Sequence, residues 1–137
     1  MKLIDRWNIK KKLKYQGKSP FFESVGHALN GIEYTITKER NFRIEITFAI
    51  LVTIASFLLK VSIMEWLILI LTIGIILALE LINTSIERCV DLVTKDYREL
   101  AKIAKDASAG AVLIMSMFSV IIGIVIFMPK ILALLCK

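Results

Sequence analysis

Residues 66–82 have the sequence WLILILTIGIILALELI, in which Glu80 is the only ionisable side chain. A transmembrane helix needs about 20 mostly apolar residues to cross roughly 30 Å of hydrocarbon. Residues 46–59 and 107–128 form two further long apolar blocks. A buried soluble core is the alternative, but a soluble domain would not gather its apolar residues in this way. With flanking residues included, the predicted membrane spans of this all-α protein are 44–63, 65–92 and 106–128.

The basic residues are distributed unevenly along the chain. The net charge is +6, and ten of the 18 Lys and Arg lie before the first span, whereas five lie within 88–105. Only Lys60 lies between the first two spans, and only Lys130 and Lys137 follow the third. This asymmetry follows the positive-inside rule, so we expect a multi-pass cell-membrane protein with a cytoplasmic N-terminus and an external C-terminus. A basic chain can also bind nucleic acid, but this distribution favours the membrane, and no nucleic-acid partner is expected.

The chain before the first span divides into two parts. Residues 1–18 are basic and polar, and Ser19 and Pro20 then suit the N-cap and the first position of a helix. Apolar residues follow at alternating spacings of three and four, which is typical of an amphipathic helix in the membrane interface. These residues are Phe22, Val25, Leu29, Ile32 and Ile36. We therefore predict an interfacial helix over 19–37, a charged cytoplasmic connection over 94–105, and one membrane domain covering all 137 residues.

Small residues recur in the spans at spacings that suit helix contacts. Gly74 and Ala78 are four residues apart, and Ala109, Ser116 and Gly123 repeat every seven. In lipid, small side chains at such positions let helix backbones approach closely. Three spans alone bury little surface, so we expect the chain to form an oligomer.

Four polar residues lie on one face at the cytoplasmic end of the second span: Glu80, Asn83, Glu87 and Asp91. An ionisable residue within a span is costly and indicates function by default; a structural polar seam between helices is the alternative. Three carboxylates repel one another unless a cation lies among them, and hard oxygen ligands suit Mg²⁺. We therefore predict a magnesium site. Zinc is not expected, because the only histidine is His27, which lies outside this face.

Residues on two other segments are candidates for the same site. Lys105 and Asp106 stand at the start of the third span, where a lysine and a helix N-terminus can hold a phosphate; an ordinary positive-inside anchor is the alternative. Glu39, at the base of the first span, would complete the acidic site from another helix, although spacing alone does not show this. The sequence has no G-x-x-x-x-G-K-[ST] loop, no Gly-rich kinase loop and no G-x-S-x-G elbow.

Two stretches carry a resemblance to a known family. Residues 80–91, ELINTSIERCVD, and 104–113, AKDASAGAVL, closely resemble the prokaryotic diacylglycerol kinase family, and the resemblance extends over 31–127. They are most similar to its Gram-positive branch, which is understood to phosphorylate undecaprenol. The resemblance implies an ATP-dependent lipid kinase that uses Mg²⁺ and forms a homotrimer with sites shared between neighbouring protomers. Undecaprenol is the expected substrate, and diacylglycerol is the alternative.

The resemblance also implies roles for individual residues. Glu80 matches the general base that takes the proton from the lipid hydroxyl, and Glu39 and Glu87 match the pair that holds the metal of ATP. Ala109 stands on the lipid side, where the diacylglycerol-using branch can have a hydroxyl, and this favours a different lipid. The positions implied to contact the nucleotide and its phosphates are Asn83, Asp96, Tyr97, Arg98, Lys105 and Asp106, together with Glu39 and Glu87.

The sequence departs from the family at two positions. Pro20 stands where the family often has an arginine, and Lys18 would have to take the place of that arginine. His27 stands where an aromatic residue can occur.

A different class of protein, a non-enzymatic channel or transporter subunit, is the remaining alternative. A polar stripe that lines a pore would continue along the span. Above Glu80 the second span is apolar except for Thr72, so an active site at the membrane surface is favoured.

Overall fold

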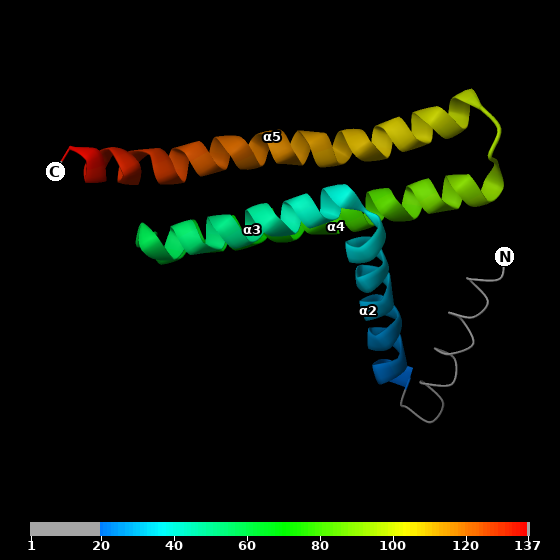
Figure 1. The fold of residues 1–137 in the computed structure, drawn as a ribbon, viewed down its shortest axis with the longest axis horizontal. Helices are drawn as coiled ribbons and strands as arrows, with labels where there is room; N and C mark the ends of the chain where they lie inside the picture. The colour runs from blue at the N-terminus through cyan, green and yellow to red at the C-terminus, as the bar shows by residue number, and fades with distance from the viewer. Residues whose placement is uncertain (1–19, 137) are drawn as a thin grey trace.

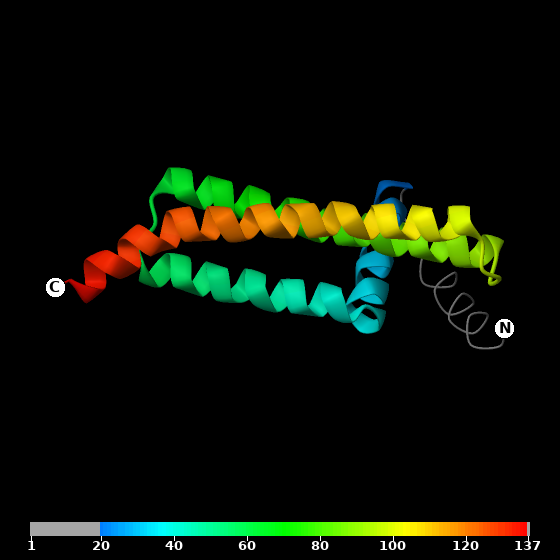
Figure 2. The same ribbon diagram turned by 90° about the horizontal axis from the view of Figure 1, so that it is seen from above.

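A computed structural model describes residues 20–136, so the predicted basic segment 1–18 lies outside the described residues. The chain forms four helices in the order α2 (Pro20–Lys38), α3 (Arg40–Leu58), α4 (Ile63–Val93) and α5 (Glu99–Leu135). Three of them, α3, α4 and α5, run side by side along the long axis, and α2 crosses this direction where α3 begins (Figures 1 and 2). These three helices are long and apolar enough to cross a membrane. The predicted all-α fold with three helices able to cross a membrane is thus confirmed.

The turn between α3 and α4 begins earlier than the predicted end of the first span at residue 63. Helix α3 covers Arg40–Leu58, and Lys60 adopts a left-handed backbone with a φ of 50°. Ser62 then caps α4, because its hydroxyl accepts from the Glu65 backbone N–H while the Glu65 carboxylate accepts from the Ser62 N–H at 2.6 Å. This capping box starts a new helix, so residues 59–62 belong to the turn.

The third span is longer than predicted at both ends. Helix α5 begins at Glu99, within the predicted connection 94–105, and continues through Pro129 to Leu135. The predicted end at residue 128 was wrong. Proline removes one backbone donor, but ending the helix in an apolar surrounding would leave several backbone groups without partners. Because the residues after Pro129 are mostly apolar, continuing the helix costs less.

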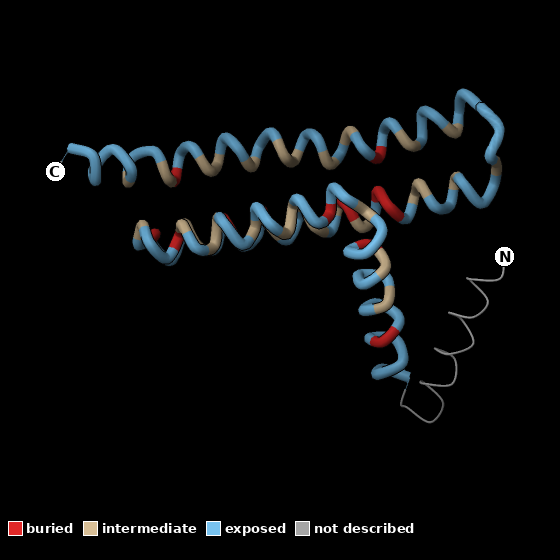
Figure 3. Tube along the Cα trace, in the orientation of Figure 1, coloured by how far each residue is buried: buried red, intermediate tan, exposed pale blue. Residues whose placement is uncertain are grey.

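Helix α4 lies in the middle of the three long helices. It packs against α5 over much of its length and against α3 over less of it, whereas α3 and α5 hardly meet. The buried apolar core is small and lies toward the α3–α4 turn, where Val61, Leu69 and Ile126 pack with Trp66 and Phe127. Most other apolar residues are exposed, and exposed positions predominate along the helices in Figure 3. Such a surface is stable only in an apolar medium or against other chains.

The small residues predicted to mark helix contacts divide into two groups. Gly74 and Ala78 are exposed, and a Cβ atom added to Gly74 would have no neighbour within 4 Å. The expected contact at these two residues is therefore absent within residues 20–136 of one chain. Ala109, Ser116 and Gly123 instead line the space between α3 and α5.

Candidate active site

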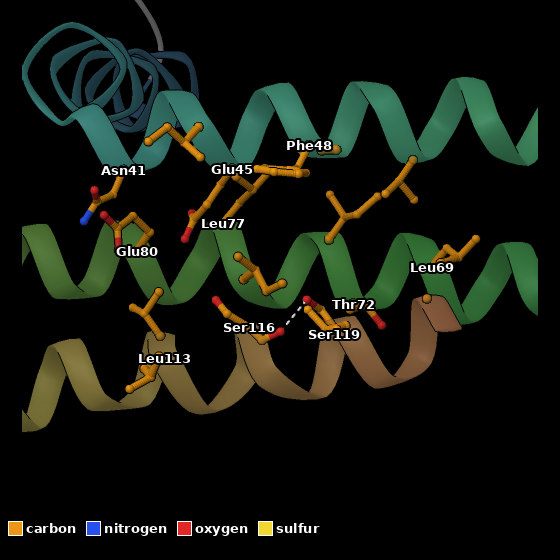
Figure 4. A pocket seen from close by; sticks show the side chains of 18 of the residues that line it. Asn41, Glu45, Phe48, Leu69, Thr72, Leu77, Glu80, Leu113, Ser116 and Ser119 are labelled. Atoms are coloured by element: carbon orange, nitrogen blue, oxygen red, sulfur yellow. Dashed lines mark hydrogen bonds between the residues drawn. The ribbon is translucent and has the colours of Figure 1, made fainter. Parts of the chain in front are cut away.

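A groove runs between α3 and α5, and α4 forms its floor. We call it the α3–α5 groove. It has a volume of about 640 Å³. Its polar end is formed by Asn41 and Glu45 of α3 and by Glu80 and Asn83 of α4. Beyond them the lining is mostly apolar, and Phe48, Leu77 and Leu113 stand next to the polar end (Figure 4). The groove thus offers a long apolar path that leads to a carboxyl group.

Glu80 is the most enclosed acidic residue in the described part of the chain, with 3% of its surface exposed. Its place on α4 turns it into the groove, where Glu45 of α3 lies beside it (Figure 4). Glu39 and Glu87 are close enough for their charges to act on it. The structure therefore brings together the carboxylates of Glu39, Glu80 and Glu87, which the sequence placed on two different helices.

Asn83 is held by the following turn of α4 and by α5. Its side-chain N–H₂ donates to Oε1 of Glu87 at 3.4 Å, one turn along α4. Its Oδ1 accepts from the hydroxyl of Ser108 on α5 at 2.7 Å, and both residues are buried. Ser108 Oγ also lies 2.8 Å from the backbone oxygen of Lys105. Asn83 therefore couples Glu87 to the first turns of α5.

A chain of alternating charges lies next to this cluster. Arg88 of α4 forms an ion pair with Glu39, the N-cap residue of α3. The same guanidinium lies 4.0 Å from Asp91 Oδ2 and stands over the ring of Tyr34, 5.8 Å from its centroid. Lys105 of α5 donates to Asp91 Oδ1 at 2.5 Å. The chain of Glu39, Arg88, Asp91 and Lys105 ties α3, α4 and α5 together.

The loop segment Asp96, Tyr97 and Arg98 lies apart from Glu80. Val93, the last residue of α4, is thirteen positions after Glu80, which corresponds to roughly 20 Å at 1.5 Å per residue. All three loop residues are exposed, and Thr94 Oγ1 accepts from the Asp96 backbone N–H at 3.1 Å to form a tight turn. Asp106 is exposed on α5, while Ala109 lines the groove.

The acidic side chains near Glu80 offer few donors for a metal ion. In residues 20–136 no group of three or more His, Cys, Asp or Glu side chains is placed to hold one. Glu39 and Glu87 nevertheless supply hard oxygen donors beside Glu80, and Mg²⁺ commonly uses one or two carboxylates together with substrate phosphates. The donor set therefore fits Mg²⁺ bound with a nucleotide, provided that Glu39 leaves Arg88.

Three residues of the site were missed by the sequence analysis. Glu45 lines the groove beside Glu80, Ser108 holds Asn83, and Arg88 holds Glu39. Glu45 carried a signal, because it is an ionisable residue at the edge of an apolar span. Ser108 and Arg88 carried none, since their importance comes from contacts between helices.

Comparison with known proteins defines the class. The description of the family that matches residues 26–127 is "Prokaryotic diacylglycerol kinase". The chain therefore belongs to the prokaryotic diacylglycerol kinase family and is a membrane lipid kinase, as its resemblance predicted. Kinases of this family use ATP as the phosphoryl donor.

The chain is similar in sequence to several lipid kinases. The chain is 50% identical over 110 residues to the undecaprenol kinase of Bacillus subtilis, which covers 80% of this chain and 89% of the relative. It is 34% identical over 102 residues to a diacylglycerol kinase of Helicobacter pylori (74% and 79%). It is 29% identical over 105 residues to the diacylglycerol kinase of Escherichia coli K12 (77% and 86%).

Proposed function

We propose that this protein transfers the γ-phosphoryl group of ATP to the hydroxyl of undecaprenol at the cytoplasmic face of the cell membrane. One observation carries the proposal: buried Glu80 stands at the end of a mostly apolar groove, next to the carboxylates of Glu39, Glu45 and Glu87. A lipid alcohol needs both features, because its chain must stay in apolar surroundings while its hydroxyl meets a base and a nucleotide.

The lining of the α3–α5 groove suits a long hydrocarbon chain. Apolar side chains of all three long helices, among them Phe48 of α3 and Phe127 of α5, form its walls. Ala109, which also lines the groove, has a small side chain without a hydroxyl. An isoprenoid alcohol has no polar group besides its terminal hydroxyl, whereas diacylglycerol carries two ester groups next to its hydroxyl. The apolar wall at Ala109 therefore favours undecaprenol, as does the similarity to the Bacillus subtilis enzyme.

The reaction assigns a role to each group. Glu80 takes the proton of the lipid hydroxyl, the oxygen forms a bond to the γ-phosphorus, and the bond from that phosphorus to the bridging oxygen of ADP breaks. Lys105 neutralises phosphate charge, and Asn83 and Asp106 orient the nucleotide, with Asp96, Tyr97 and Arg98 near its far end. Glu39 and Glu87 would hold Mg²⁺, which would neutralise the charge on the phosphates when bound.

The assembly that we propose is a homotrimer with active sites shared between neighbouring protomers. Its support within one chain is the exposed pair Gly74 and Ala78 on α4, which leaves a smooth helix face free for close approach by a second copy.

We also propose that α2 lies in the membrane interface. Its exposed apolar side chains, among them Phe22, Val25 and Leu29, support this position.

A phosphorylation assay tests the proposed function. The purified protein in detergent is mixed with labelled ATP, Mg²⁺ and either undecaprenol or diacylglycerol, and a matched reaction contains EDTA. Label in undecaprenyl phosphate that disappears with EDTA is the expected result. Label in phosphatidic acid alone would replace undecaprenol with diacylglycerol as the substrate. Label in neither lipid would contradict the kinase proposal.

A labelling experiment tests the proposed orientation. Single cysteines are introduced by Ser62→Cys and Tyr97→Cys into a variant in which Cys89 and Cys136 are replaced by serine. In intact cells, a membrane-impermeant maleimide should label position 62 and leave position 97 unlabelled until the cells are opened. The opposite pattern would place the carboxylates away from cellular ATP.

A further inference from the structure

We propose that Arg88 competes with the divalent cation for the Glu39 carboxylate and acts as a positioning residue of the metal site. In the absence of nucleotide Arg88 holds Glu39, and when the cation arrives Arg88 turns to Asp91. This inference rests on the proposed role of Glu39 as a metal ligand, and its test does not depend on lipid phosphorylation.

The contacts of Glu39 show that its carboxylate is already engaged. Glu39 is the N-cap residue of α3, yet its side chain makes no capping hydrogen bond. The carboxylate instead reaches across to α4 and pairs with Arg88, 49 residues further along the chain. The Glu39 side chain is 21% exposed and that of Arg88 is 45% exposed. A cation that binds Glu39 must therefore displace a guanidinium from a partly enclosed position.

Arg88 has other partners that remain when Glu39 is taken. Its Nη1 lies 4.0 Å from Asp91 Oδ2 on the same helix face, and its guanidinium stands over the Tyr34 ring. A planar guanidinium with five donors can hold two carboxylates at once, which an ammonium group does less well. Arg88 can thus shift toward Asp91 without leaving the site, while Lys105 holds the other oxygen of Asp91.

The ion pair of Arg88 with Glu39 affects both the repulsion between the carboxylates and the binding of a cation. Without a cation, Glu39, Glu80 and Glu87 would repel one another, and Arg88 reduces this repulsion by neutralising Glu39. A free divalent cation must displace Arg88 from Glu39 without additional ligands. A cation bound to ATP already has phosphate ligands. The Arg88–Glu39 pair therefore favours the cation–nucleotide complex over the free cation.

The test measures binding of Mn²⁺ alone to the nucleotide-free protein by electron paramagnetic resonance. Arg88→Gln frees Glu39 and should tighten Mn²⁺ binding roughly fivefold, the effect of removing one partly exposed ion pair. Arg88→Lys, which keeps the charge but not the fork of donors, should lie between the Arg88→Gln variant and the wild type. Lys102→Gln is the matched control, because it removes one exposed cation from α5 and should leave Mn²⁺ affinity close to that of the wild type.

A double variant shows where the gain originates. In Glu39→Gln Arg88→Gln the tighter binding should disappear, since the released carboxylate is gone. Equal Mn²⁺ affinity in the wild type, Arg88→Gln and Arg88→Lys would overturn the inference, and so would a gain that persists in the double variant. Either result leaves the proposed kinase activity intact, because that activity fails only if the wild type phosphorylates neither lipid.

Discussion

The Ser108 hydroxyl of α5 donates to the side-chain oxygen of Asn83 on α4 at 2.7 Å, within the buried part of the helix interface. This bond fixes which way the Asn83 amide faces. With its oxygen held by Ser108, the amide directs its N–H₂ group toward Glu87. A hydroxyl on one helix therefore sets the orientation of two residues of the proposed nucleotide site on another.

Ser108→Ala should weaken both nucleotide binding and stability. The variant leaves the Asn83 oxygen buried without this partner, which costs about 1–3 kcal/mol. We expect a lower unfolding midpoint and a higher KM for ATP, with a smaller change in kcat. Thermal unfolding in detergent and steady-state kinetics measure these effects. Ser85→Ala is the control, because Ser85 is exposed on α4 and its hydroxyl donates to the Leu81 carbonyl of the same helix. Equal effects of both variants would show that Ser108 does not position Asn83.

Glu87→Gln should abolish turnover and leave the protein folded. The amide keeps the size of the side chain and can still contact Asn83, but it removes the negative charge proposed to hold the metal of ATP. The kinase assay, size-exclusion chromatography in detergent and Mn²⁺ binding provide the three measurements. Near-normal activity together with unchanged Mn²⁺ binding would rule out Glu87 as a metal ligand.

Glu80→Gln tests the proposed general base. A positioned base typically contributes roughly 10²–10⁴-fold to the rate, so kcat should fall by about that factor. ATP affinity should survive, because Glu80 faces the lipid groove and its role is toward the acceptor alcohol. A variant that loses ATP affinity but retains kcat would show Glu80 to be a metal ligand and would remove the proposed base.

The helices were predictable from the sequence, but several of their ends were not. Apolar composition alone identified three spans, because a membrane requires this composition over a minimum length. Apolar composition does not show where a helix begins or ends. The predicted third span therefore lacked the part of α5 that begins at Glu99 and the part that follows Pro129. Ser62 and Glu65 have the spacing of a capping box, which starts α4 and so limits the first span. The predicted first span ran past this signal because it was extended to the length that a membrane requires.

The candidate site was predictable along one helix and less so between helices. Glu80, Asn83 and Glu87 share a face of α4 because helical spacing alone places them there. The partners contributed by other helices depend on how α3 and α5 rotate and slide against α4, which no local pattern records. Ser108 and the pairing of Arg88 with Glu39 became visible only in the structure.

Glu45→Leu should stabilise the lipid-free protein. Among the described residues Glu45 Oε2 is a buried oxygen without a hydrogen-bond partner, and it lies in the α3–α5 groove near Phe48 and Leu77. Such an atom costs on the order of 1–3 kcal/mol, and leucine would fill the space with apolar atoms. The unfolding midpoint in detergent without lipid should therefore rise, with ATP affinity unchanged. Glu45→Gln is the control, because it retains a polar group at the same place and should gain little. A leucine variant less stable than the glutamine variant would show that this oxygen has a partner in the assembled protein.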